Sequence, residues 1–291
     1  MPLRLLLLMS LLSSVLISPG IPEAKSLREK SGLIGPIHTV VEESGTWIDK
    51  DRVFRSAWTY DTKGNQVESE VSSYKLDSPF SREGLKSTHT YDPNKNREEV
   101  ISNWMDGSPS DKSIYTYDMN GNRTEHASYD AEGHLRFKWV FNYDNQGRKI
   151  ESKHFKGDGS LQAYSKTAYS VKAIGITTSE YVYRAPARTD GTLDYGSVTT
   201  FDEQGNPVEV IVYNGDGTFD KKAIYKYEKG LETELVVHNA DGSIREKETT
   251  AYEFDVIGNW IKKTSMKQMT KEGKLSPEPP YIIRRTITYY K

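Results

Sequence analysis

The chain has 291 residues, a formal net charge of −2 and no cysteine. Acidic and basic residues alternate along it, so no basic patch indicates nucleic acid as a partner, and disulfides cannot hold the fold together. Only 35% of the residues are hydrophobic, yet 19 tyrosines and 5 tryptophans are too many aromatics for a disordered polar chain. This composition favours a thin, extended β structure whose apolar surface comes from aromatic rings.

The N-terminus has the pattern of a secretory signal peptide. Arg4 supplies a short positive region, and an apolar run from Leu5 to Ile17 follows it. A run of ~13 residues is shorter than the ~20 that a permanent membrane anchor needs. A buried N-terminal helix is the alternative, but the Ser/Pro/Gly break after the run favours export. We expect residues 1–24 to be the signal peptide, with cleavage after Gly20 or Ala24.

Export sets the expected location and the start of the mature chain. Residues 25–35 form a lead-in to the first repeat. The mature protein is expected to be secreted, periplasmic or attached to the cell surface, with no transmembrane span once the signal is removed.

A short motif, an aromatic residue followed by an acidic one and then a turn, recurs along the chain. Its copies begin at Tyr60, Tyr91, Tyr117, Tyr143, Phe201, Tyr227 and Phe254. The spacings are 31, 26, 26, 58, 26 and 27 residues, and the long gap divides into 26 and 32 if Tyr169-Ser170 is a decayed copy. A period this regular predicts a repeat architecture.

Each copy of the motif has the chemistry of a hairpin turn. The acidic side chain can accept hydrogen bonds from the backbone two residues on, and the glycine accepts the positive φ that follows a type I turn. The residues with this structural role are Asp61, Gly64, Asp92, Asp118, Gly121, Asp144, Gly147, Asp202, Gly205, Asp255 and Gly258.

A second turn lies about halfway along each unit, as in MDGS at 105–108 and NADGS at 239–243. Asp-Gly is a strong signal for a two-residue hairpin turn. Two turns per 26 residues leave two strands of about eight residues. The predicted fold is therefore all-β, an antiparallel meander of β-hairpin repeats with about sixteen to eighteen strands in a curled or spiralled sheet.

The repeat units divide the mature chain into segments. Residues 36–168 form the first half of the units and residues 201–291 the second half, with a proline-rich segment near 269–283. Residues 169–200 break the period and are expected to form an irregular unit or a joint between the halves.

Aromatic residues also recur two positions before the motif, at Trp58, Tyr115, Phe141, Tyr225 and Tyr252. Positions i and i+2 of a strand point to one face, so these rings are expected to line up across the sheet. Stacked core is the favoured interpretation of most of the aromatic residues.

The motif and its spacing resemble the YD (RHS) repeat family. The resemblance covers roughly residues 36–265, although most copies have Gly-Asn, as at Gly121-Asn122, where the family more often has Gly-Arg. It implies β-hairpins that coil into a spiral or hollow shell. It also implies a secreted or surface, non-enzymatic binding or scaffold protein, with an accessory or remnant of an Rhs-type toxin system as the alternative.

No catalytic, cofactor-binding or metal-binding motif stands out, and an enzyme with an unrecognised site is the third hypothesis. The histidines at 38, 89, 126, 134, 154 and 238 lack metal-ligand spacing. DMNGNRTE at 118–125 places oxygen side chains as calcium loops do, but its glycine stands at position 4 and not at 6, so a turn is favoured. We expect no cofactor.

Four tryptophans lie away from the repeated motif, at Trp47, Trp104, Trp139 and Trp260. If exposed, they could stack on sugar rings; if buried, they belong to the core. The expected partner is thus an unidentified protein or carbohydrate.

Overall fold

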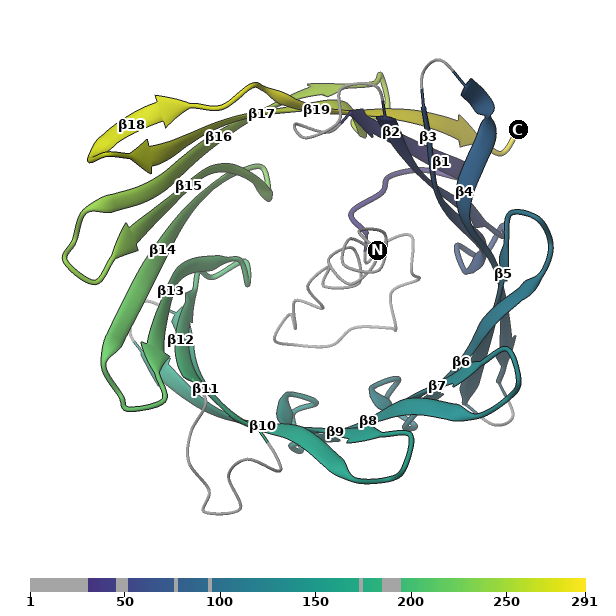
Figure 1. Cartoon of the computed structure of the whole chain (residues 1–291), viewed down its shortest axis with the longest axis horizontal. Coiled ribbons are helices and arrows are strands. Elements are labelled where there is room, and N and C mark those ends of the chain that lie inside the picture. The colour runs from purple at the N-terminus through teal and green to yellow at the C-terminus, as the bar shows by residue number, and fades with distance from the viewer. Residues whose placement is uncertain (1–30, 46–51, 76–77, 94–95, 173–174, 185–194) are drawn as a thin grey trace.

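The computed structural model describes residues 31–45, 52–75, 78–93, 96–172, 175–184 and 195–291. The predicted signal peptide at 1–24 and Trp47 lie outside the described residues. The described chain is a single antiparallel meander in which nearly every strand pairs with the strand before it in the sequence (Figure 1). The predicted all-β hairpin meander is confirmed.

Nineteen strands make up the described part of the chain. They are β1 (Ile37–Gly45), β2 (Arg52–Tyr60), β3 (Gln66–Lys75), β4 (Ser78–Asp92), β5 (Arg97–Trp104), β6 (Pro109–Tyr117), β7 (Arg123–Asp130), β8 (Leu135–Tyr143), β9 (Lys149–Lys156), β10 (Leu161–Lys172), β11 (Gly175–Arg184), β12 (Tyr195–Phe201), β13 (Pro207–Asn214), β14 (Phe219–Glu228), β15 (Leu231–Asn239), β16 (Ile244–Phe254), β17 (Trp260–Lys271), β18 (Lys274–Pro277) and β19 (Tyr281–Tyr289).

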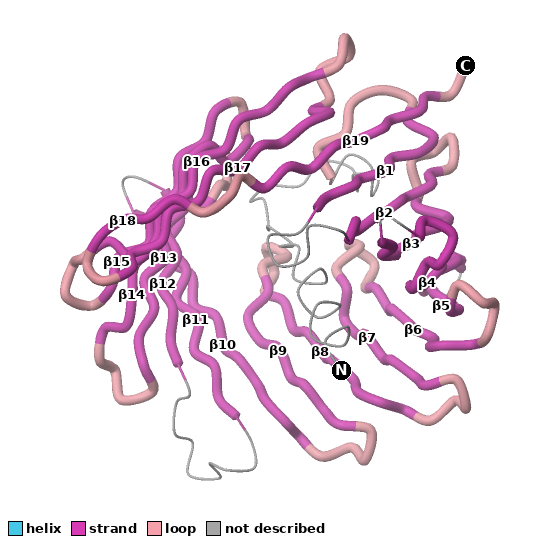
Figure 2. Tube along the Cα trace, turned by 45° about the horizontal axis from the view of Figure 1, so that its top comes forward, coloured by secondary structure: helices cyan, strands magenta, loops and turns pink. Residues whose placement is uncertain are grey.

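The strands are arranged in a ring (Figures 1 and 2). β1 pairs with β2 on one side and with the last strand, β19, on the other. β19 also pairs with β17 at Lys262–Ser265, while the short β18 pairs antiparallel with the last residues of β17, Gln268–Lys271. Backbone pairing therefore runs continuously from the first strand to the last, which is how the predicted curl is completed.

The repeated turn has one geometry in most copies of the motif, seen clearly at 118–122, whereas the copy at 227–230 has positive φ at both Lys229 and Gly230. The N–H of Gly121 donates to the carbonyl of Asp118 at 3.0 Å, and Gly121 has a φ of +79°. The Asp118 carboxylate accepts from the N–H groups of Asn120 and Asn122 at 2.9 and 2.8 Å. The acidic residue thus satisfies the backbone of the loop, and glycine supplies the left-handed conformation.

The second turn differs from the predicted two-residue hairpin. At 104–108, the N–H of Gly107 donates to Trp104 O at 2.8 Å and the N–H of Trp104 donates to Ser108 O at 2.9 Å. Gly107 has a φ of +86°, whereas Asp106 is not in the positive region that a type I′ turn requires of both residues. Asp106 instead accepts from the N–H of Ser108 at 2.9 Å. Both turns of the unit are therefore three-residue loops closed by glycine.

The segment expected to be irregular, 169–200, contains regular strands where it is described. β11 pairs with β10 over ten positions, from Ala163–Arg184 to Lys172–Gly175, and with β12 on its other side. The hydroxyl of Tyr169 donates to Lys149 O at 2.8 Å, as Tyr143 donates to Arg123 O at 2.7 Å. Tyr169 therefore keeps the interaction of the repeat tyrosine, although residues 173–174 and 185–194 lie outside the description.

The sheet has two chemically distinct faces. We call the face that carries Val40, Trp58 and Tyr60 the inner face. Leu33 is buried against Val40 and Tyr60, and residues 31–36 lie inside the ring (Figure 1). The accessible surface of the chain is 18525 Å², against about 12,500 Å² for a compact protein of its mass, as expected for a single sheet with two uncovered faces.

The opposite, outer face carries a repeated ion pair between neighbouring strands. In each case a glutamate pairs diagonally with a lysine on the next strand. These pairs are Glu99–Lys112 at 3.0 Å, Glu125–Lys138 at 3.6 Å, Glu209–Lys222 at 3.5 Å and Glu234–Lys247 at 3.1 Å. Such half-exposed pairs contribute roughly 0–1 kcal/mol each, so their main consequence is a charged, water-compatible outside.

Candidate binding face

Four rings on neighbouring strands form a continuous row on the inner face: Tyr115 of β6, His126 of β7, Trp139 of β8 and His154 of β9. The cross-strand register places each one opposite the next. Tyr115 stacks on His126 with ring centroids 4.4 Å apart, and Trp139 stacks on His154 at 4.3 Å with nearly parallel planes. We call these four residues the aromatic row.

Small and aromatic neighbours support the row along the strands. Phe137 contacts both His126 and His154 edge-on, with centroids 5.3 and 5.7 Å away. Phe141 lies parallel to Trp139 at 6.1 Å. Ser128 and Ser152, which are buried, occupy the cross-strand positions opposite Phe137 and Phe141 and leave room for the larger rings.

The histidines of the row are held in the neutral form. Burial, and then the positive charge of Arg123, lower the pKa of His126 to about 4. Burial also lowers the pKa of His154, whose Nε2 is buried without a hydrogen-bond partner among the described residues. At neutral pH the row is therefore an uncharged aromatic surface with polar ring atoms.

A separate polar network lies beside the row on β3, β4, β5 and β6. Nδ1 of His89 is 2.9 Å from Oε1 of Glu98, and the hydroxyl of Tyr117 donates to Oε2 of Glu98 at 2.8 Å. Burial alone would raise the pKa of Glu98, but the hydrogen bonds from His89 and Tyr117 outweigh it and lower the pKa. Burial and the nearby carboxylate raise the pKa of Tyr117. Glu98 is thus an anion with both oxygens bonded.

The tryptophans considered as sugar-stacking residues are not brought together. Trp104 lies at the end of β5 and is 42% exposed. Trp260, at the start of β17, is covered by the guanidinium of Arg285 at 3.3 Å from the ring centroid. Of the three candidate tryptophans in the described part of the chain, Trp139 alone joins the aromatic row.

The predicted turn residues lie along one rim of the ring, away from the row. In five of these turns the aspartate carboxylate accepts a hydrogen bond from a backbone N–H of its own loop. The aspartates are Asp61, Asp118, Asp144, Asp202 and Asp255. The glycines with positive φ are Gly64, Gly121, Gly147, Gly205 and Gly258. Asp92 ends β4 opposite Arg97, and in that copy Asn96 adopts the positive φ of 45°.

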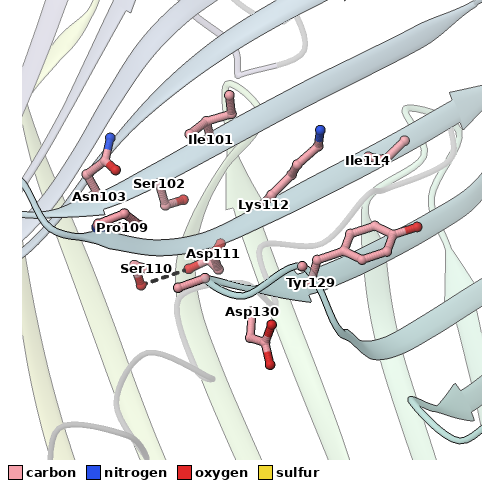
Figure 3. A pocket seen from close by; sticks show the side chains of 12 residues that line it. Ile101, Ser102, Asn103, Pro109, Ser110, Asp111, Lys112, Ile114, Tyr129 and Asp130 are labelled. Carbon is pink, nitrogen blue, oxygen red and sulfur yellow. Dashed lines mark hydrogen bonds between the residues drawn. The ribbon is translucent and has the colours of Figure 1, made fainter.

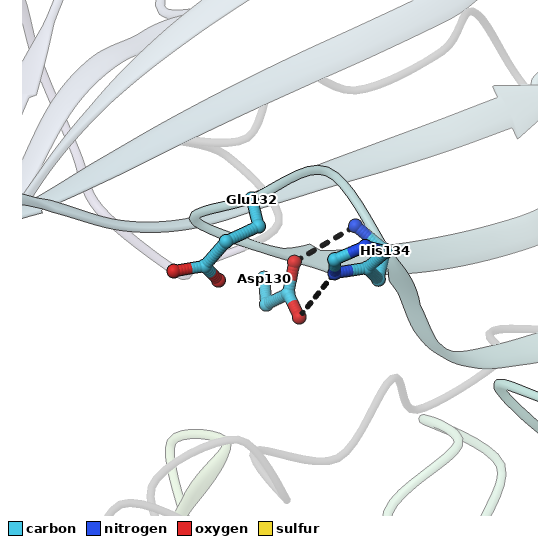
Figure 4. Close-up of side chains that lie close together, drawn as sticks. All are labelled: Asp130, Glu132 and His134. Atoms are coloured by element: carbon cyan, nitrogen blue, oxygen red, sulfur yellow. Dashed lines mark hydrogen bonds and ion pairs between the residues drawn. The ribbon is translucent and has the colours of Figure 1, made fainter.

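Among the described residues, one group of potential metal ligands occurs at a turn: Asp130, Glu132 and His134 (Figure 4). Asp130 accepts from the N–H of His134 at 2.8 Å and lies 3.3 Å from its Nδ1. Asp118 and Asn122 make the same contacts in their turn. The group is accounted for by turn geometry.

The outer face has a shallow groove between β5, β6 and the turn after β7, lined by Ile101, Lys112, Ile114 and Tyr129 (Figure 3). An equivalent groove recurs between β13, β14 and the turn after β15, lined by Ile211, Lys222, Ile224 and His238. The lysine of each groove pairs with a glutamate of the outer face. These grooves repeat because the hairpin unit repeats.

A known structure shares this fold. A porin-like protein from Bacteroides uniformis ATCC 8492 superposes with a TM-score of 0.51 and 14% sequence identity, covering 87% of this chain and 96% of its own. A porin-like protein from Bacteroides vulgatus ATCC 8482 gives a TM-score of 0.37 at 11% identity, covering 87% of this chain and 98% of its own. The chain thus resembles the porin-like protein of Bacteroides uniformis in fold.

The expected relationship to the YD (RHS) repeat family is wrong. No protein-family model matches the chain, and no curated protein matches it either. The structural similarity over most of its length is instead to a porin-like protein. An aromatic-acidic turn motif closes hairpins in any antiparallel meander, because its turn chemistry is local, so it did not identify the family.

None of the described residues belongs to a helix with the length and hydropathy of a membrane span.

The sequence did not identify the aromatic row or the network around Glu98. His126 and His154 have no spacing that marks a site, because their partners lie on other strands. Two features of the sequence could have indicated the row. Side chains alternate between the two faces along β6 to β9, and the 26-residue period brings Tyr115 and Phe141 to the same face.

Proposed function

We propose that the protein is an exported cell-envelope protein that binds a carbohydrate on the inner face of its ring. The aromatic row is the observation that carries this proposal. Trp139 and its stacked neighbours are flat apolar rings that stay half-buried on the inner face, and ring nitrogens and serine hydroxyls lie beside them. Sites for small polar ligands combine these two features.

The location follows from separate observations. The N-terminal apolar run has the pattern of an export signal, and the fold is that of porin-like proteins. The lysine–glutamate pairs of the outer face favour water over lipid on the outside of the ring, because a lysine in a lipid-facing strand costs about 2–4 kcal/mol at the bilayer midplane. We therefore place the mature ring in the periplasm, at the cell surface or outside the cell.

The test is a glycan array followed by fluorescence titration of the soluble oligosaccharides that bind. Trp139→Ala should weaken the binding at least about tenfold, or ~1.4 kcal/mol. Trp104→Ala, a tryptophan outside the row, should bind as the wild type does. An array with no bound glycan, or full affinity in a folded Trp139→Ala variant, contradicts the proposal.

A further inference from the structure

Three side chains on adjacent strands of the inner face lie in a chain of hydrogen bonds. Oγ of Ser69, on β3, is 3.0 Å from Nε2 of His89, on β4. Nδ1 of the same imidazole is 2.9 Å from Oε1 of Glu98, on β5. A hydroxyl, an imidazole and a carboxylate in this order are the parts of a serine nucleophile activated by a general base.

The strand register explains how these residues meet. Ser69 lies opposite Ser87, so His89 is its diagonal neighbour on the same face. His89 in turn lies opposite Val100, which makes Glu98 its diagonal neighbour. Two successive diagonals across β3, β4 and β5 thus align groups that are 20 and 9 residues apart in the sequence.

The surroundings fix the carboxylate and the imidazole. Tyr117 bonds the second oxygen of Glu98, so the carboxylate cannot rotate away from His89. The side chains of His89 and Glu98 are only 13% and 15% exposed. Because the anionic Glu98 accepts from Nδ1, the proton of the neutral imidazole lies on Nδ1, and the lone pair of Nε2 is shared by two donors, Ser69 and Gln66.

We propose that Ser69, His89 and Glu98 form a hydrolytic site for carboxylic esters. This activity goes beyond the proposed binding function and does not depend on it. It also departs from the sequence-based expectation of a non-enzymatic protein. In this site Ser69 and His89 are catalytic residues, and Glu98 is a positioning residue.

The reaction uses water as its only co-reactant. Oγ of Ser69 forms a bond to the ester carbonyl carbon while its proton passes to Nε2 of His89. The bond from the carbonyl carbon to the alcohol oxygen then breaks, and His89 gives its proton to the departing alcohol. Water next attacks the acyl-serine with His89 as base, the carboxylic acid leaves, and the proton returns to Ser69.

A side-chain amide stands next to the nucleophile. Nε2 of Gln66 is 2.9 Å from the same imidazole nitrogen that Ser69 contacts. Once substrate displaces it from the imidazole, this amide is the donor that the site offers to the negative oxygen of the tetrahedral intermediate.

The first experiment treats the mature full-length chain with a fluorophosphonate probe, which labels activated serines, and identifies the labelled peptide by mass spectrometry. We expect the label on Ser69. The matched control is Ser113→Ala: Ser113 lies 3.3 Å from Nε2 of His126, in a pair that no carboxylate joins among the described residues. Labelling should persist in that variant and disappear in Ser69→Ala. A wild-type chain without label on Ser69 overturns the proposal.

The second experiment measures hydrolysis of p-nitrophenyl acetate and butyrate. Ser69→Ala should lower the rate by about a hundredfold or to background, with an unchanged circular dichroism spectrum. Glu98→Gln should lower the rate and move the acidic limb of its pH profile to lower pH, because the amide no longer stabilises the protonated imidazole. Equal rates in wild type and Ser69→Ala, or an unmoved profile in an active Glu98→Gln, contradict the assigned roles.

Discussion

Gly121 shows at the residue scale why the turn motif needs its glycine. Its φ is +79°, and a Cβ added there would meet nothing within 4 Å. The only obstacle to a side chain is therefore the backbone conformation itself. A substitution at this position therefore tests the strain of a positive φ without a steric clash.

We expect Gly121→Val to lower the free energy of unfolding by about 1–3 kcal/mol, because a β-branched residue is strained at positive φ. Met119→Val is the matched control, since Met119 lies in the same loop and is 95% exposed without a positive φ. Urea melts of both variants give the comparison. Equal losses would show that the conformation of the turn glycine is not what the motif selects.

The buried imidazole of His126 on the inner face is expected to make the stability of the fold depend on pH. The pKa of this histidine is lowered to about 4 in the fold, chiefly by burial, from an ordinary value of 6.5. Between these two values the unfolded chain binds the proton and the folded chain does not, so stability falls as the pH is lowered from about 6.5 toward 4. We expect His126 to account for a loss on the order of 1–2 kcal/mol, reduced by the solvent that still reaches the ring.

Urea melts of the wild type and His126→Gln at pH 7.5 and pH 5 measure this loss. The difference in stability between the two pH values should shrink in His126→Gln. It should stay at the wild-type value in His134→Gln, whose imidazole is exposed on a turn. The same pH dependence in all three proteins would contradict the role given to His126.

At the residue scale, the sequence predicted the interactions between residues that are close together in the chain. Asp118 and Gly121 are three residues apart, and their turn needs no other part of the chain. His89 and Glu98 required the register of β4 against β5, which no spacing in the sequence fixes. The second turn was predicted with the wrong geometry because Asp-Gly fits two kinds of hairpin, and only the φ of Asp106 separates them.

At the element scale, the tyrosine of the motif joins one hairpin to the previous one. The hydroxyl of Tyr143 donates to Arg123 O, and that of Tyr169 donates to Lys149 O. Each bond links the first residue of one unit to the residue that directly follows the turn of the unit before it. The tyrosine is thus part of the contact between units as well as of its own turn.

Tyr143→Phe should lower the free energy of unfolding by about 0.5–1.5 kcal/mol, the net contribution of one hydrogen bond, and leave the carbonyl of Arg123 without this donor. Tyr129→Phe is the control, because the Tyr129 hydroxyl donates to no group in the described part of the chain. Thermal and urea melts of the two variants measure the difference in their free energies of unfolding. A Tyr143→Phe protein as stable as Tyr129→Phe would show that the hydroxyl does not join the units.

Strand number and alternation were predictable because each strand has a turn at both ends and a period of two along it. The pairing of β1 with β19 was not. These strands lie 249 residues apart at Thr39 and Thr288, and nothing in the local pattern states that the first strand meets the last. The diagonal ion pairs of the outer face depend on register in the same way.

At the scale of the whole molecule, the ring can be treated as a series of units that contact only their neighbours. In such an array, stability is close to a sum over units and their interfaces. Closure through β1 and β19 adds one more interface of the same kind, which includes the ion pair between Arg285 and Glu42 at 2.6 Å. Removing one complete unit should therefore leave the remaining interfaces intact.

Deletion of residues 117–142 removes 26 residues, one period, and joins Thr116 to Tyr143. β6 then runs into the turn at 144–147 and pairs with β9, with Tyr115 in the place of Phe141 on the inner face. Strand direction and side-chain face are both kept, because two strands leave as a pair and 26 is even. We expect a folded, somewhat less stable protein that unfolds cooperatively and has lost the aromatic row.

Deletion of residues 117–129 removes 13 residues and a single strand, so that every strand downstream would have to reverse direction. This variant should misfold, and the closing pair of β1 with β19 cannot form in it with antiparallel register. Circular dichroism and urea melts distinguish the two deletions. Loss of cooperative unfolding in both would mean that the ring folds as one indivisible core, because a repeat array tolerates the loss of a whole unit and a single core does not.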